Sequence, residues 1–371
     1  MGRCVRFCNR TSEVIHSSES TGPSSSFAAH YWGMVPPMIQ SKILLASTAR
    51  RDGEDPRLFR RAAERREMVR VSRGAYMTSS DWASLDDEEK YRSRVIGTSL
   101  ASRTGITVSH ASAAVLWGIP LVGNLPQFVH VLSSESTGTR SEGLVRRHSS
   151  RALQIGIEEL DGVVLTSFTR TVVEFVHTVS FASGVVALDW ALTPSTPRRP
   201  KPSVTRAELL GMIDELGIGR GKRDIVRALE FANPLSGSPG ESLSRVTIAR
   251  AGLPAPELQC EFSDARGRIG LVDFWWPTAN VIGEFDGVKK YTQDEFMGGQ
   301  SSAEVVVAEK LREDRLRASS SRPIVSRWGW KLANSPDLLR DHLVSAGVPM
   351  EARAKTIAFD PPRALKIDGR I

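Results

Sequence analysis

Apolar and polar residues alternate along the last third of the chain in runs that predict β-strands. ELQCEFSD (257–264), GRIGLVDFWW (267–276) and VIGEFD (281–286) are separated by short turn sequences. A helical pattern lies before them, in SPGESLSRVTIARAG, and a charged helical run, AEKLREDRLR, lies after them. The segment RPIVSRW then predicts one more strand. This order of helices and strands predicts an α+β domain.

The pattern near the start of the chain changes period within a short segment. DPRLFRRAAE has apolar residues at helical spacing, whereas MVRV and AYM, on either side of Ser72-Arg73-Gly74, predict a small hairpin. A helix followed by a hairpin is how a winged helix ends. Further on, residues 109–118 and 169–179 predict helices, and QFVHVLSS and LVRRH predict strands. His110, His130 and His148 fall among these elements, and we expect them to be structural histidines.

These patterns predict an α+β multidomain protein. Four prolines in 193–203 predict an extended linker, and Thr205 with Glu208 predicts a capping box at the start of a helical pair. We expect Met34 or Met38 to be an alternative start of the chain, because the Ser-rich segment before them has few aliphatic residues. The predicted parts are a disordered tail (1–37), a winged helix (38–77), an α+β region (78–192), the linker (193–203), a helical connector (204–236), a second α+β domain (237–347) and a tail (348–371).

The composition indicates which kinds of partner and which compartment the protein suits. The 371 residues carry a net charge of +7, and the sequence pI is about 9.5, a sign of charge that suits a polyanion such as DNA. No apolar run reaches the roughly 18 residues of a membrane span, and no apolar signal-peptide region follows the basic start. Three cysteines do not suggest a disulfide framework. We therefore expect a reduced, cytoplasmic protein without a membrane partner.

Arginines are concentrated around the predicted winged helix. Nine lie between positions 50 and 73, against five acidic residues. Cations along a helix and a hairpin are typical of phosphate contacts, and the alternative is a solvated surface of mixed charge. The candidate DNA-binding residues here are Arg60, Arg61, Arg65, Arg66, Arg70 and Arg73.

Acidic residues interrupt the apolar strands of the last third. Glu284 and Asp286 are expected to share one strand face, and Asp273 lies beside them if the strands at 267–276 and 281–286 are antiparallel. Carboxylates held this close need a counter-charge, either a divalent cation such as Mg²⁺ or Mn²⁺ or a basic neighbour. Glu241 falls in the first turn of a helix, where the helix dipole alone also favours an acid. Lys310 and Arg312, on the charged helix, are further candidates for DNA contact, with a solvated helix face as the alternative.

The segment from Gly240 to about Leu343 resembles the PD-(D/E)xK nuclease superfamily, in its very-short-patch-repair-like and DUF559-like branch. The resemblance rests on SPGES, VDFWW, GEFDG followed by KKY, AEKLREDRLRAS and RPIVSRW, in this order. It implies a restriction-endonuclease-like mixed sheet flanked by helices and a Mg²⁺- or Mn²⁺-dependent DNA endonuclease. By resemblance, Glu241, Asp273 and Glu284 take the metal-site positions. The candidate catalytic residues are Asp273 and Glu284, as the metal ligands, with Asp286 or Glu241 assisting.

One position departs from that superfamily pattern. Asp286 stands where the superfamily usually has a lysine, which is thought to orient or activate the attacking water. Lys289, Lys290 and Lys310 are candidate replacements for this lysine, and Lys289 is also a candidate DNA contact. The acidic cluster favours an active endonuclease, whereas the missing lysine favours a nuclease fold that only binds DNA.

Residues 39–180 carry a second resemblance. REMVRVSRGAYM, VSHASAAVLWGIPL, FVHV and TSFTRTVVEF are similar to actinobacterial AbiEi-like antitoxins of type IV toxin–antitoxin systems. This resemblance implies a winged helix that binds promoter DNA, and a cognate toxin as a possible partner. The sequence thus leaves two functions open, a metal-dependent endonuclease and a non-enzymatic transcriptional regulator or antitoxin.

Overall fold

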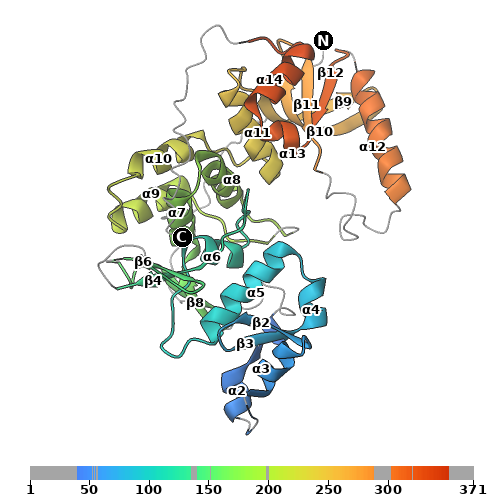
Figure 1. The fold of residues 1–371 in the computed structure, drawn as a ribbon. Helices are drawn as coiled ribbons and strands as arrows, with labels where there is room; N and C mark the ends of the chain where they lie inside the picture. The colour runs from blue at the N-terminus through green and yellow to red at the C-terminus, as the bar shows by residue number, and fades with distance from the viewer. Residues whose placement is uncertain are drawn as a thin grey trace, which may run out of the picture. The chain divides into compact units, whose positions relative to one another are not determined.

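The computed structural model describes residues 40–51, 53, 55, 57–134, 140–150, 152–197, 200–287, 302–319 and 321–350. Its chain forms two compact units, one ending at Pro234 and the other beginning at Leu235 (Figure 1). Both units combine helices and sheets, so the predicted α+β multidomain class is confirmed. Among the described residues, none of the helices has the length and apolar character that crossing a membrane requires.

The N-terminal unit begins with a small three-stranded sheet of strand order β1-β3-β2. The first strand pairs antiparallel with the third, Leu44 opposite Tyr76, and the second and third form the predicted hairpin. Two helices lie between the first strand and the hairpin. The elements are β1 (Leu44–Leu45), α2 (Ala46–Arg51), α3 (Arg57–Glu64), β2 (Met68–Ser72) and β3 (Ala75–Thr78).

Helices α4 (Ser79–Ser84) and α5 (Asp87–Leu100) complete this region. Asp86 and Glu89 form a capping box that starts α5. The absence of a side chain at Gly97 brings α5 close to the hairpin, since a Cβ there would lie 3.0 Å from the Cβ of Ala75. Helix α5 thereby covers the apolar face of the hairpin and leaves α3 on the outside.

The rest of the N-terminal unit is a helical layer packed on short sheets. The side chains of Trp117, Leu165, Phe168 and Val172 are buried in its core, and the Trp117 indole N–H donates to the Thr166 carbonyl. Its elements are α6 (His110–Leu116), β4 (Val129–Ser133), β5 (Arg140–Glu142), β6 (Val145–Ser149), β7 (Ile157–Leu160), β8 (Val163–Thr166), α7 (Phe168–Thr178) and α8 (Phe181–Leu192).

The segment after α8 also belongs to this unit. Helices α9 (Arg206–Glu215) and α10 (Lys222–Phe231) pack against α7 and α8. Thr205 and Glu208 form the capping box that the sequence predicts. Lys201, within the predicted linker, donates to the carbonyls of Trp190 and Thr193 and so ties this end of the segment to α8.

The C-terminal unit is built on a four-stranded mixed sheet of strand order β12-β11-β10-β9. The first three strands along the chain are antiparallel neighbours, whereas β12 is parallel to β11, with Glu284 opposite Arg327. Helices flank the sheet, as predicted. The elements are α11 (Pro239–Arg250), β9 (Glu257–Asp264), β10 (Gly267–Trp276), β11 (Val281–Phe285), α12 (Ser302–Arg317), β12 (Ile324–Trp328), α13 (Trp330–Ala333) and α14 (Pro336–Ser345).

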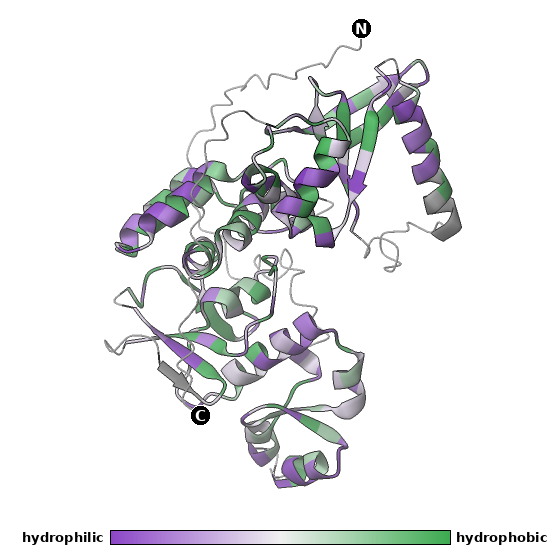
Figure 2. Cartoon of the chain, turned by 45° about the horizontal axis from the view of Figure 1, so that its top comes forward, coloured by the Kyte–Doolittle hydropathy of each residue, from purple (hydrophilic) through white to green (hydrophobic). Residues whose placement is uncertain are grey.

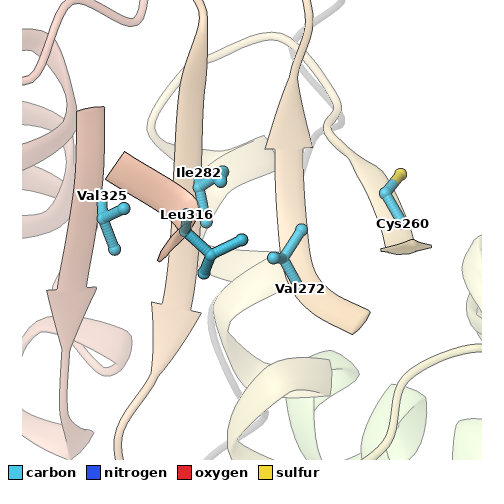
Figure 3. Packing of buried hydrophobic residues seen from close by; sticks show 5 residues of the cluster. All are labelled: Cys260, Val272, Ile282, Leu316 and Val325. Carbon is cyan, nitrogen blue, oxygen red and sulfur yellow. The ribbon is translucent and has the colours of Figure 1, made fainter. Parts of the chain in front are cut away.

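The two faces of this sheet are covered by different helices. On one face Leu316 of α12 packs against Val272, Ile282 and Val325, with Cys260 beside them (Figure 3). On the other face the Trp328 indole N–H donates to Ser244 of α11. Figure 2 shows the strands as largely hydrophobic and α12 as largely hydrophilic, in agreement with a helix that buries only a narrow stripe.

Strand β11 is shorter than the sequence pattern indicates. It ends at Phe285, so Asp286 lies just beyond the strand, where its backbone N–H donates to the Trp328 carbonyl over 2.8 Å. That Glu284 and Asp286 lie on the same side of this strand therefore stays a prediction, because the regular alternation of the described strand ends one residue before Asp286.

Candidate functional site

Helix α11 begins against the middle of the sheet. Ser238 is its N-cap and accepts a hydrogen bond from the backbone N–H of Glu241, and Pro239 occupies the first turn. A Cβ at Gly240 would lie 2.0 Å from Cε1 of Phe285, so only glycine permits this approach. The approach buries Glu241, which is 6% exposed, and its Oε2 accepts from the Gly237 backbone N–H at 2.8 Å.

Gln259 connects two of the candidate carboxylates. Its Nε2 donates to Glu241 Oε2 at 2.9 Å and lies 3.5 Å from Asp273 Oδ1. The other oxygen of Asp273 accepts from the Phe285 backbone N–H at 2.8 Å. Sequence reasoning missed Gln259, because a glutamine in a strand gives no periodic or charge signal. Its φ of 49°, unusual for a residue other than glycine, is also visible only in the structure.

Asp273 lies where strand β10 changes the face toward which its side chains point. Val272 packs on the α12 side with Leu316, whereas Phe274 stacks on Trp328 on the α11 side. Residues two apart in a regular strand share a face, so the alternation is broken at residue 273. The break places the Asp273 carboxylate between Gln259 and the backbone of β11, close enough to Glu284 for the two charges to repel.

Glu284 is buried at 7% exposure, yet both of its oxygens have a cationic partner. Arg312 Nη1 lies 2.9 Å from Oε1, and Arg327 Nη2 lies 3.0 Å from Oε2. Burial raises the pKa of the Glu284 carboxyl, and Asp273 adds to the rise, while the two guanidinium groups oppose it. The sequence left open whether a divalent cation or a basic neighbour balances these carboxylates. In the structure two basic neighbours, Arg312 and Arg327, lie beside Glu284.

Arg327 has further partners on α12. Its Nη1 lies 2.6 Å from Glu309 Oε1, and its Nε lies 3.2 Å from Glu313 Oε2. Arg312 has a second partner as well, since its Nη2 donates to the Leu271 carbonyl. The sequence placed Arg327 in a strand near the edge of the site, but no spacing rule pairs it with Glu284.

The remaining predicted residues of this unit lie elsewhere. Asp286 is past the end of β11, and Lys289 and Lys290 lie outside the described residues. Lys310 is exposed on α12, whereas Arg312 is half-buried against Glu284. Of the two predicted DNA contacts on α12, only Lys310 thus faces solvent.

Mg²⁺ and Mn²⁺ prefer oxygen ligands, and the carboxylates of Asp273 and Glu284 match that preference. Glu284 Oε1 is buried and makes no hydrogen bond of good geometry, although Arg312 lies beside it. Within the part of the chain that the structure describes, no group of three or more His, Cys, Asp or Glu is arranged to hold a metal ion. The donor chemistry fits a divalent cation, and Arg312 and Arg327 lie where it would bind Glu284.

The predicted DNA-binding arginines of the N-terminal unit lie on α3, directly after it, and on the β2–β3 hairpin. Helix α3 has no buried residue, and Phe59 is its contact with the hairpin, 5.6 Å from the Tyr76 ring centroid. Arg65 is held by Glu67 through two hydrogen bonds. All six predicted DNA-binding arginines of this unit are exposed, Arg60, Arg61, Arg65, Arg66, Arg70 and Arg73.

Three histidines that are far apart in the sequence form one cluster. His130 Nδ1 and His148 Nε2 are 2.9 Å apart, and the His110 ring stacks on His148 with centroids 3.8 Å apart. His110 Nδ1 also lies 3.5 Å from Glu174 Oε2, and Glu174 is paired with the buried Arg170. Burial lowers the pKa of His130 to about 3 and that of His148 to about 4. The lowered pKa values keep these imidazoles neutral at pH 7, and their structural role stays a prediction.

No model of a known protein family matches the chain. Two proteins of Mycobacterium tuberculosis, both named as uncharacterized, are similar to it, one from strain CDC 1551 / Oshkosh and one from strain ATCC 25618 / H37Rv. Each is 26% identical over 181 residues, which cover 48% of this chain and 61% of the relative. The chain thus matches less than two thirds of either relative.

Proposed function

We propose that this chain is a DNA-binding protein that contacts duplex DNA through helix α3 and the β2–β3 hairpin. The observation that carries the proposal is the β1-β3-β2 sheet with an outward helix before its hairpin, together with the exposed arginines on both elements. A helix can enter the major groove, and a hairpin can reach the adjacent backbone. In this role the protein is a cytoplasmic transcriptional regulator or antitoxin, with a toxin protein as a further partner.

The test is DNA binding measured at several salt concentrations. Replacing Arg60, Arg61 and Arg73 with glutamine removes three cations from the proposed surface. If each neutralises one phosphate, the slope of log affinity against log salt becomes shallower by about 2 to 3. We expect the affinity at moderate salt to fall at least tenfold.

The matched control replaces three exposed arginines of the C-terminal unit, Arg266, Arg268 and Arg322, with glutamine. Both triple variants change the net charge equally, so only the position of the charges differs. An equal loss of affinity in both would contradict the assignment of DNA contact to α3 and the hairpin.

A second candidate function is a metal-dependent endonuclease in the C-terminal unit. The specific observation that favours it is the connection of Glu241 to Asp273 through Gln259, with Asp273 in turn beside Glu284. Asp273 and Glu284 would hold the cation. Bound Mg²⁺ or Mn²⁺ supplies a Lewis acid for a phosphate oxygen and a more acidic water.

Incubation with supercoiled plasmid and Mg²⁺ or Mn²⁺ separates the two functions. Nicking by the wild type, and none by an Asp273→Ala, Glu284→Ala variant, would establish the endonuclease. If neither protein nicks the plasmid and both bind DNA, the regulator remains and the nuclease-like unit acts only in binding or stability.

A further inference from the structure

In the C-terminal unit, the buried carboxylate of Glu284 has a guanidinium group beside each oxygen. The Glu284 side chain is 10% exposed, while those of Arg312 and Arg327 are 28% and 24% exposed. A cation that used Glu284 as a ligand would need the oxygens beside which these guanidinium groups lie. Binding of a divalent cation and pairing with the two arginines are therefore competing states of one side chain.

Both arginines have other acceptors in place. Arg327 lies against Glu309 and Glu313, and Arg312 donates to the Leu271 carbonyl. Breaking a buried ion pair is costly chiefly because a charge is left without a partner. If Glu284 bound a divalent cation instead, each guanidinium group would still have an acceptor. Replacing the arginines by the cation therefore avoids most of the cost of an unpaired buried charge.

We propose that Arg312 and Arg327 form a counter-ion lock on Glu284. While both guanidinium groups pair with Glu284, no divalent cation binds the Asp273–Glu284 pair. The cation binds when Arg312 leaves Glu284 and keeps the Leu271 carbonyl, and Arg327 leaves Glu284 and keeps Glu309 and Glu313. This proposal rests on the endonuclease candidate and describes the regulation of that same site. In the locked state the carboxylate is stable without metal. In the open state Glu309 and Glu313 hold Arg327.

The first test is titration of the full-length protein with Mn²⁺ alone, without DNA, followed by electron paramagnetic resonance of the free ion. An Arg312→Gln, Arg327→Gln variant lacks the competing cations, and we expect it to bind Mn²⁺ at least tenfold more tightly than the wild type. The added Asp273→Ala change should abolish this gain, since it removes a ligand from the pair.

The matched control is Arg266→Gln, Arg268→Gln. These arginines are exposed in the same unit, and Arg268 pairs with Glu261 rather than with Glu284, Glu309 or Glu313. Removing them changes the net charge equally, so a general electrostatic gain would appear in both variants. Equal affinities in the two double variants would overturn the lock.

A second measurement follows the two arginines directly in the wild type. In the wild type with isotope-labelled arginine, titration with Mg²⁺ should shift the Nε–H signals of Arg312 and Arg327, and the Asp273→Ala variant should show no such shift. Tight Mn²⁺ binding by the wild type with unmoved arginine signals would overturn the lock and leave the endonuclease candidate intact. Absence of site-specific Mn²⁺ and Mg²⁺ binding in every protein would overturn both.

Discussion

Gly240 sets the distance between helix α11 and strand β11. Because Gly240 has no side chain, there is room for the ring of Phe285, the residue between Glu284 and Asp286 in the sequence. The sequence indicated a helix start at SPGES, but local rules cannot tell a glycine that a helix tolerates from one that a neighbour requires. Close packing on β11 at this point also brings Glu241 within reach of Gln259.

Replacing Gly240 with alanine should destabilise the C-terminal unit. The new Cβ would lie 2.0 to 2.5 Å from three atoms of the Phe285 ring, so the helix or the ring must move. Overpacking of this kind typically costs about 1 to 3 kcal/mol. Denaturant unfolding followed by tryptophan fluorescence measures the loss.

Gly211→Ala is the matched control for this change. Gly211 lies inside α9, and a Cβ added there would meet no neighbouring atom within 4 Å, so alanine should stabilise the helix by about 0.5 to 1 kcal/mol. If Gly240→Ala were as harmless as the control, α11 would not be in contact with Phe285 as described.

At the scale of elements, helices α6 and α7 and strands β4 and β6 bring together a buried polar cluster. His110 is the first residue of α6 and has a φ of 51°. Its ring forms a hydrogen bond with the Ser109 hydroxyl, so the Ser109 side chain does not cap the helix. Glu174 and Arg170 face the cluster from α7, and Arg146 lies near it on β6. Four separate segments must fold before these groups meet.

The lowered pKa values of His130 and His148 predict that the N-terminal unit loses stability in mild acid. As the pH falls below about 6.5, both histidines become protonated in the unfolded chain. In the folded cluster they stay neutral until the pH reaches their lowered pKa values, about 4 for His148 and about 3 for His130. Each histidine then contributes a loss of up to about 1.4 kcal/mol per pH unit. The raised pKa of Glu174 acts in the opposite direction, because its protonation favours the folded state.

Hydrogen exchange measured between pH 7.5 and pH 5, with the intrinsic rates corrected, tests this prediction. Amides of α6 and α7 should lose protection, whereas those of β11 in the C-terminal unit should not. A His130→Gln, His148→Gln variant should lose less protection than the wild type over the same range. A pH-independent exchange of α6 and α7 in the wild type would show that the histidines are not held neutral.

At the scale of the whole molecule, the chain separates its two candidate functions between two compact units. The arginines of α3 and the hairpin belong to the unit ending at Pro234, and the carboxylates around Asp273 belong to the unit beginning at Leu235. Each unit has its own buried core. Changes in one core are therefore expected to leave the other unit's surface intact.

Calorimetry of the full chain should show two unfolding transitions. Gly240→Ala should lower the temperature of only one of them and leave DNA affinity unchanged at a temperature where both units are folded. A parallel fall in both transitions, or a loss of DNA binding, would mean that the units depend on each other for stability.

The sequence alone determined the elements whose signals are local. Three elements depend only on residues a few positions apart, so the sequence predicts them directly. They are the capping box of Thr205 and Glu208, the start of α11 at Ser238 and the β2–β3 hairpin. The periods of the last third indicated its strands and helices, whereas the mixed sheet flanked by helices was expected from the family resemblance.

Only the tertiary structure decided which charges meet. Glu284 finds its partners Arg312 and Arg327 on two other elements, Gln259 reaches Glu241 from a neighbouring strand, and β11 ends before Asp286. The two-residue strand β1 exists through its pairing with β3. Such contacts depend on strand register and helix packing, which a one-dimensional pattern does not specify, because the partners lie far apart in the chain.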